Sequence, residues 1–168
     1  MIQFFVRLKF GRNYLCAGSL IDGETVITAA HCCSGFSYKD YEVYLNDHFY
    51  HTVDQRETKV GLKAMEYHKA FSWQTFKHDI CILTLAKDVT QIIGGEMNFP
   101  CLPPPDFRWA PGTECYAAGW GLTKEYGSIA PELQSVNIDT IDDTTCQQLQ
   151  DHSPEEMICA GVIGGKFN

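Results

Sequence analysis

The sequence predicts an all-β protein, and three observations lead to that prediction. Short runs of aliphatic, aromatic and β-branched residues recur along the chain, separated by turn residues such as Asp22-Gly23. A proline-rich stretch divides these runs into a longer and a shorter set. Eight cysteines in 168 residues indicate a disulfide framework, which is typical of secreted proteins. Runs with this spacing favour an antiparallel barrel or sandwich over alternating strands and helices.

The part of the chain before the prolines contains the longer set of candidate strands. Each run is short, and the first alternates in part between polar and apolar residues, as a half-buried strand does. The runs cover residues 3–8, 15–21, 25–29, 41–45, 60–67 and 80–85. We expect them to form one domain, residues 1–99.

Residues 100–113 include Pro103-Pro104-Pro105 and are expected to link two domains, because proline is excluded from a central strand or helix. After this linker, the runs 114–118, 133–139 and 157–161 indicate strands. Residues 142–150 indicate one short helix with Asp142 or Asp143 as its N-cap. So few strands cannot close a barrel and would leave edges unpaired. We therefore expect residues 114–168 to form a partial domain.

Charge and hydropathy exclude two classes of partner. The 13 Lys and Arg residues against 21 Asp and Glu give a net charge of −8, which argues against nucleic acid and anionic membranes. No apolar run approaches the roughly 20 residues that span a bilayer. The first residues, Met1-Ile-Gln-Phe-Phe-Val-Arg-Leu-Lys, do not form a signal peptide because the apolar stretch is too short. We expect an extracellular protein whose chain is incomplete at its N-terminus, with the signal peptide outside it.

Two motifs carry the chemistry. His31 follows a candidate strand and a turn of small residues, and Asp79 opens another strand that is otherwise apolar. A carboxylate partly buried at a barrel rim needs a hydrogen-bond donor, and a histidine from a neighbouring turn could supply one. Histidine titrates near neutral pH, so it can take a proton from a hydroxyl and return it to a leaving amine. An acid that orients a histidine makes up two of the three members of a nucleophilic triad.

These motifs resemble those of the trypsin/chymotrypsin family of serine endopeptidases. Ala29-Ala30-His31-Cys32 matches the family's catalytic-histidine motif, and Asp79-Ile80 matches its catalytic-aspartate motif. Gly119-Trp120-Gly121 matches a turn early in the second barrel, and residues 157–161 match the strand that leads to the specificity pocket. The resemblance implies a trypsin-like fold of two barrels, the first nearly complete and the second partial.

The resemblance also implies a function. It is proteolysis through an acyl-enzyme, with His31 as general base and Asp79 as its orienter. The implied partners are protein or peptide substrates and protein inhibitors of proteases, and no cofactor is required.

The chain departs from the family pattern at both ends. The family's Ile-Val-Gly-Gly activation segment is absent, and its serine-bearing Gly-Asp-Ser-Gly-Gly segment would follow Gly164-Gly165-Lys166 beyond Asn168. We therefore expect a fragment without the nucleophile, inactive as given. Gly164-Gly165-Lys166 resembles the approach to the pocket floor in members that cleave after Lys or Arg. Two alternatives stay open: an inactive serine-protease homologue with a binding or regulatory role, and a secreted disulfide module unrelated to proteases.

The cysteines give further expectations. The resemblance implies the disulfides Cys16–Cys32 and Cys146–Cys159, and it places the partners of Cys101 and Cys115 outside the chain. A Cys16 bonded elsewhere would favour the unrelated module. We also hypothesise a Cys33–Cys81 disulfide, since each cysteine lies two residues beyond His31 or Asp79, which must approach each other.

One polar loop contains candidate metal ligands. In some relatives an acid pair at this place binds calcium together with backbone carbonyls, and Asp47 and Glu57 have the matching spacing. Phe49 and the histidines of His48-x-x-His51 make this loop unusual. The histidines lack an evident third ligand for a metal. A solvated loop is the alternative to calcium.

Overall fold

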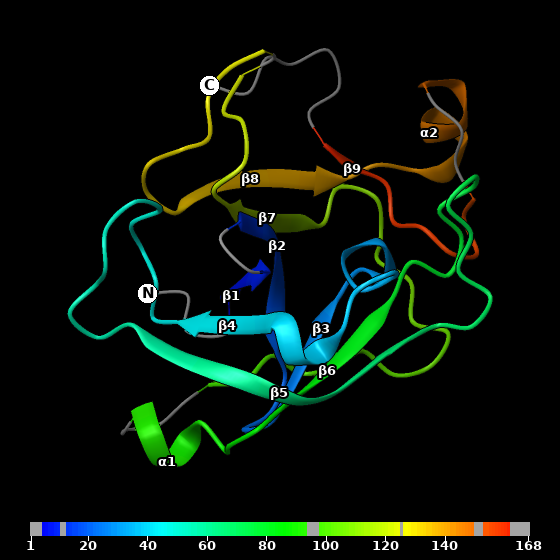
Figure 1. Ribbon diagram of the computed structural model, residues 1–168. Coiled ribbons are helices and arrows are strands. Elements are labelled where there is room, and N and C mark those ends of the chain that lie inside the picture. Colours follow the sequence, from blue (N-terminus) through cyan, green and yellow to red (C-terminus); the bar gives the residue numbers. More distant parts are fainter. Residues whose placement is uncertain (1–4, 11–12, 94–97, 125, 150–152, 162–168) are drawn as a thin grey trace. The chain divides into compact units, whose positions relative to one another are not determined.

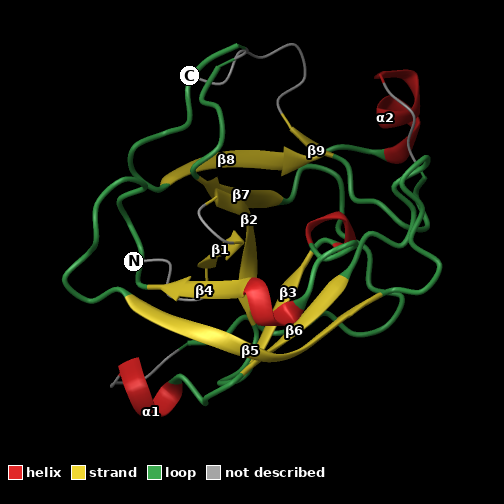
Figure 2. Cartoon of the chain, in the orientation of Figure 1, coloured by secondary structure: helices red, strands yellow, loops and turns green. Residues whose placement is uncertain are grey.

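We analysed a computed structural model that describes residues 5–10, 13–93, 98–124, 126–149 and 153–161. The chain divides into two compact units, residues 1–102 and 103–168. The described elements are mostly strands, joined by loops and a few short helices (Figure 2). This confirms the all-β class that the sequence predicts.

The first unit is a closed antiparallel barrel, with strands in the order β1-β2-β3-β6-β5-β4 (Figure 1). In the barrel, β6 and β5 lie between β3 and β4. The strand before His31, β3, and the strand after Asp79, β6, are therefore neighbours. The strands are β1 (Phe5–Phe10), β2 (Asn13–Leu20), β3 (Thr25–Thr28), β4 (Tyr41–Leu45), β5 (Thr58–Tyr67) and β6 (Cys81–Leu85). The closed barrel leaves none of these strands as an open sheet edge.

The barrel core follows from the period-two alternation of its strands. In β6, Leu83 is fully buried, whereas the next residue towards the N-terminus, Ile82, is 47% exposed. β3 pairs with β6 in a register that sets Thr28 opposite Cys81, so the ladder ends just before both candidate catalytic residues. At Gly18 an added Cβ would lie 2.7 Å from Val26 Cγ1, so only glycine allows β2 to approach β3 this closely.

Short helices lie in the connection between β3 and β4 and after β6. They are η1 (Ala30–Cys32), η2 (Tyr38–Asp40) and α1 (Thr90–Ile93). The sequence pattern did not predict α1, which begins where Asp88 Oδ1 accepts hydrogen bonds from Thr90 N and Oγ1, at 2.9 and 2.5 Å. Among the described residues, no helix has both the length and the apolar character needed to cross a membrane.

The second unit contains a three-stranded sheet, β7 (Glu114–Gly119), β8 (Gln134–Thr140) and β9 (Ala160–Gly161), and the helix α2 (Asp143–Leu149) (Figure 1). Asp142 caps α2, since its carboxylate accepts hydrogen bonds from Thr145 N and Oγ1. These bonds lower the pKa of Asp142. The predicted strand 157–161 is shorter in the structure, because the amide of Met157 bonds instead to Ser153 O in a turn.

The alternation in β6 gives a matched pair of variants. We expect Leu83→Ala to lower the free energy of unfolding by roughly 2–5 kcal/mol, because it opens a cavity in the core. Ile82→Ala should cost less than about 1 kcal/mol, since its side chain is half exposed. Urea unfolding of both variants measures the difference, and equal losses would contradict the assigned faces of the strand.

Candidate active site

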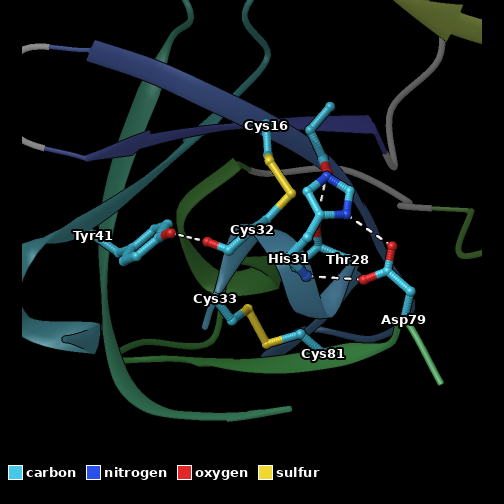
Figure 3. The surroundings of a disulfide bond; sticks show 9 residues. Cys16, Thr28, His31, Cys32, Cys33, Tyr41, Asp79 and Cys81 are labelled. Atoms are coloured by element: carbon cyan, nitrogen blue, oxygen red, sulfur yellow. Dashed lines mark hydrogen bonds and ion pairs between the residues drawn. A yellow bond between two sulfur atoms is a disulfide. The ribbon is translucent and has the colours of Figure 1, made fainter. Parts of the chain in front are cut away.

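His31 and Asp79 are brought together at one end of the β3–β6 ladder (Figure 3). β3 ends at Thr28, Ala29 stays extended, and the chain then enters the 3-10 turn η1, which contains His31. Asp79 lies just before β6. The neighbouring strands therefore bring a histidine and an aspartate to the same rim although the two are 48 positions apart in the sequence.

Two hydrogen bonds join this pair. His31 Nδ1 lies 2.7 Å from Asp79 Oδ2, and the backbone amide of His31 donates to Asp79 Oδ1 at 2.8 Å. Both carboxylate oxygens of Asp79 therefore bind His31, and this fixes the plane of the carboxylate relative to the imidazole. The side chains are 42% and 22% exposed for His31 and Asp79, respectively. In the tautomer with a proton on Nδ1, Nε2 carries the lone pair and can accept a proton.

Three attachments hold the turn η1 that carries His31. The disulfide Cys16–Cys32 ties it to β2, and the disulfide Cys33–Cys81 ties it to β6 (Figure 3). The hydroxyl of Tyr41, from β4, donates a hydrogen bond to Cys32 O. Burial raises the pKa of Tyr41 to about 12, so this phenol stays protonated as a donor. Three different strands of the barrel therefore fix one short turn.

Aromatic side chains that the sequence motifs did not single out stand beside the imidazole. The rings of Phe76 and Trp73 meet His31 edge-on, with centroids 5.9 and 6.4 Å away. Both are about half exposed, and Trp73 Nε1 donates to Ser34 Oγ at 3.4 Å. In the sequence, the aromatic residues within 71–76, just before Asp79, were the feature from which this contact could have been predicted. These rings form an apolar wall next to the base.

The loop after β4 brings Asp47, Asp54 and Glu57 together, with one ligand atom of each within 4.8 Å of the others. The sequence pattern indicated Asp47 and Glu57 here but not Arg7 of β1. Arg7 forms an ion pair with Asp47, and the two side chains are only 2% and 1% exposed. In the sequence, Arg7 stands between Val6 and Leu8, which are fully buried, and this pattern indicates only that Arg7 faces away from the barrel core.

The other residues that the sequence pattern indicated lie away from His31 and Asp79 along the chain. His48 and His51 are exposed, and they do not join a group of three metal-ligating side chains among the described residues. Trp120 is buried, and its carbonyl accepts a hydrogen bond from Ala130 N. The second unit contains the disulfide Cys146–Cys159. Cys101 and Cys115 form no disulfide within the described part of the chain. The segment 164–166 lies outside the described residues.

The barrel, the histidine and aspartate at its rim and the disulfides beside them define a class of protein. Comparison with known families matches residues 2–167 to the family described as Trypsin. The chain therefore belongs to the trypsin family.

Curated relatives show the same likeness. The chain is 34% identical over 164 residues to the suppressor of tumorigenicity 14 protein homolog of Bos taurus, covering 92% of this chain and 19% of the relative. It is 28% identical over 162 residues to transmembrane protease serine 7 of Mus musculus, covering 96% and 20%. It is also 28% identical over 163 residues to serine protease 57 of Homo sapiens, covering 93% and 55%. The chain thus spans about a fifth of the first two relatives.

The disulfide next to the site gives a first prediction here. Cys33 and Cys81 close a loop with a sequence separation of 48, so replacing both by alanine should cost about 4 kcal/mol of unfolding free energy in the chain-entropy model. It should also loosen the His31–Asp79 pair. The measurement is the exchange rate of the His31 Nδ1 proton by NMR, under conditions where the variant is folded.

The Cys146–Cys159 pair provides the control, because it lies in the other unit. Replacing both of these cysteines should leave the His31 proton exchange unchanged. Equal exchange rates in the two double variants would mean that Cys33–Cys81 does not act on the pair.

Asp47 gives a pH-dependent prediction. Burial raises the pKa of Asp47 to about 7, with Asp54 and Glu57 adding repulsion and Arg7 opposing the rise. The folded state therefore holds this proton at pH values where the unfolded chain, with a pKa near 4, has lost it. Between about pH 4 and 7, the contribution of Asp47 to the free energy of unfolding therefore falls as pH rises, by at most about 1.4 kcal/mol per pH unit.

The test compares Asp47→Asn with the wild type by urea unfolding across this range. The stability of the wild type minus that of the variant should fall as pH rises from 4 to 7. A constant or rising difference would show that Asp47 ionises normally in the fold.

Proposed function

We propose that this chain is part of a serine-type endopeptidase in which His31 is the general base and Asp79 orients it. The observation that carries the proposal is the 2.7 Å contact between His31 Nδ1 and Asp79 Oδ2 in a chain of the trypsin family. With its Nδ1 proton donated to the carboxylate, His31 keeps the Nε2 lone pair for the hydroxyl of a nucleophile.

The chemistry then runs in two steps. His31 takes the proton of the serine hydroxyl as the oxygen attacks the scissile carbonyl, and it returns this proton to the leaving amine as the acyl-enzyme forms. Water repeats the sequence to release the acid. Asp79 stabilises the imidazolium that exists between these transfers. The partial exposure of His31 supports this role, because a substrate must reach Nε2.

The family's serine-bearing segment does not occur in the 168 residues, so the activity is proposed for a protein that includes it. Its substrates are proteins or peptides, and protein inhibitors of proteases are a second class of partner. The three disulfides support an oxidising, extracellular location. The net charge of −8 supports the exclusion of nucleic acid as a partner.

The test uses the longest product of the gene, assayed on peptide amides with Lys, Arg or apolar residues before the scissile bond. We expect Asp79→Asn to lower kcat by about 10⁴, because the tautomer of His31 is lost, with a smaller change in KM. His31→Ala should lower kcat at least as much. The 168-residue chain alone should be inactive.

Two exposed residues of the same types serve as controls. Asp106→Asn and His51→Ala should leave kcat unchanged, since both side chains lie on the surface. If the longest product is folded but hydrolyses no peptide, and another residue stands at the serine position, the endopeptidase proposal is wrong and the inactive homologue with a regulatory role takes its place.

A further inference from the structure

A buried arginine lies among the acids of the loop that joins β4 and β5. The guanidinium of Arg7 pairs with Asp47 Oδ2 through Nη2 and donates to the backbone carbonyl of Tyr50 through Nη1 at 2.9 Å. The rings of Tyr50 and Tyr44 lie 5.2 and 5.7 Å from Arg7 Cζ. The arginine therefore reaches from a barrel strand into the loop and bonds to both a side chain and the backbone of that loop.

The loop of residues 46–57 contains three acidic residues and only one lysine or arginine, so its acids outnumber its cations. Asp54 Oδ2 accepts hydrogen bonds from the amides of His48 and Phe49, at 2.6 and 3.0 Å, and Glu57 Oε2 accepts one from Asp54 N at 3.4 Å. These bonds hold two carboxylates beside Asp47, whose Oδ1 is buried without a hydrogen-bond partner among the described residues. Asp47 is buried beside these two partly exposed carboxylates, and a buried carboxylate in such surroundings requires a cation next to it.

Calcium is coordinated in proteins by carboxylate and backbone carbonyl oxygens. In this loop, one oxygen of each kind, Asp47 Oδ2 and Tyr50 O, binds the guanidinium of Arg7 instead. Arginine matches them because its donors form a rigid planar fork and its charge persists at all physiological pH values. A calcium ion needs six to eight oxygens at about 2.3–2.6 Å, so it cannot share these two with the guanidinium. The residues present do not fit a calcium site while Arg7 is in place.

We propose that Arg7 is the built-in cation of the 46–57 loop: it takes the place that a divalent metal would need, and removing it converts Asp47, Asp54 and Glu57 into a calcium site. The loop of this chain is thus organised by its own sequence and is independent of the calcium concentration outside the cell. This inference does not depend on the proposed proteolytic activity.

The experiment compares the wild type with Arg7→Gln at pH 8. Thermal unfolding is measured with and without 10 mM calcium, and terbium luminescence, excited through Tyr50, reports binding directly. We expect no calcium response from the wild type. For Arg7→Gln we expect a rise of several degrees in Tm and a Kd of roughly 10⁻⁴–10⁻³ M, as in extracellular calcium modules.

Two further variants control for charge. Arg7→Lys keeps a cation and should behave like the wild type towards calcium. The double variant Arg7→Gln/Asp47→Asn keeps the polar groups but removes one of the three carboxylates, and its calcium affinity should fall at least tenfold below that of Arg7→Gln.

Either of two results would overturn the proposal. One is calcium stabilisation of the wild type, and the other is a folded Arg7→Gln variant that ignores calcium. If Arg7→Gln does not fold without calcium, terbium titration of the wild type decides: saturable binding at this loop refutes the proposal, and its absence supports it.

Discussion

The geometry of the candidate site depends on how one three-residue turn, η1, is attached to the barrel. A 3-10 turn of this length has too few hydrogen bonds of its own to fix the direction of His31. Its rigidity comes from outside, through the disulfides to β2 and β6 and the hydrogen bond from Tyr41. Because the β3–β6 ladder ends at the pair Thr28 and Cys81, the Cys33–Cys81 disulfide ties the end of this ladder to the residue that follows η1.

The Arg7–Asp47 ion pair and the His31–Asp79 contact differ in burial, and this difference separates a structural role from a chemical one. Arg7 and Asp47 are withdrawn from water almost completely. Removing Asp47 would therefore leave the buried charge of Arg7 uncompensated, a loss of about 3–5 kcal/mol. His31 keeps 42% of its side-chain surface exposed. A base must exchange protons with a reactant, so it cannot be enclosed in the same way. The barrel therefore places the Arg7–Asp47 ion pair under a loop and the His31–Asp79 pair at an open rim.

Much of the fold could be predicted from the sequence because barrel strands are bounded by turn residues and filled with β-branched and aliphatic residues. The Cys33–Cys81 hypothesis followed from an argument about neighbours of His31 and Asp79, and the structure has this disulfide. Arg7 could not be found this way. Its neighbours Val6 and Leu8 indicate only that it faces away from the barrel core. That this outer side is also buried depends on the loop that covers it, which is a contact between residues 43 positions apart. The aromatic wall beside His31 was missed for the same reason, since only the folded loop turns Trp73 and Phe76 towards the imidazole.

The loop at residues 46–57 and the turn η1 solve the same physical problem with different chemistry. Each is a segment with little secondary structure whose position must be fixed against conformational entropy. At η1 the constraint is covalent, and it restricts the unfolded chain as well as the folded one. At the 46–57 loop the constraint is electrostatic and exists only in the folded state, so it responds to pH through Asp47 and not to the redox state. A reducing agent should therefore release the turn of His31 while the Arg7 loop persists, and a shift in pH should change the stability of the loop while both disulfides at η1 remain.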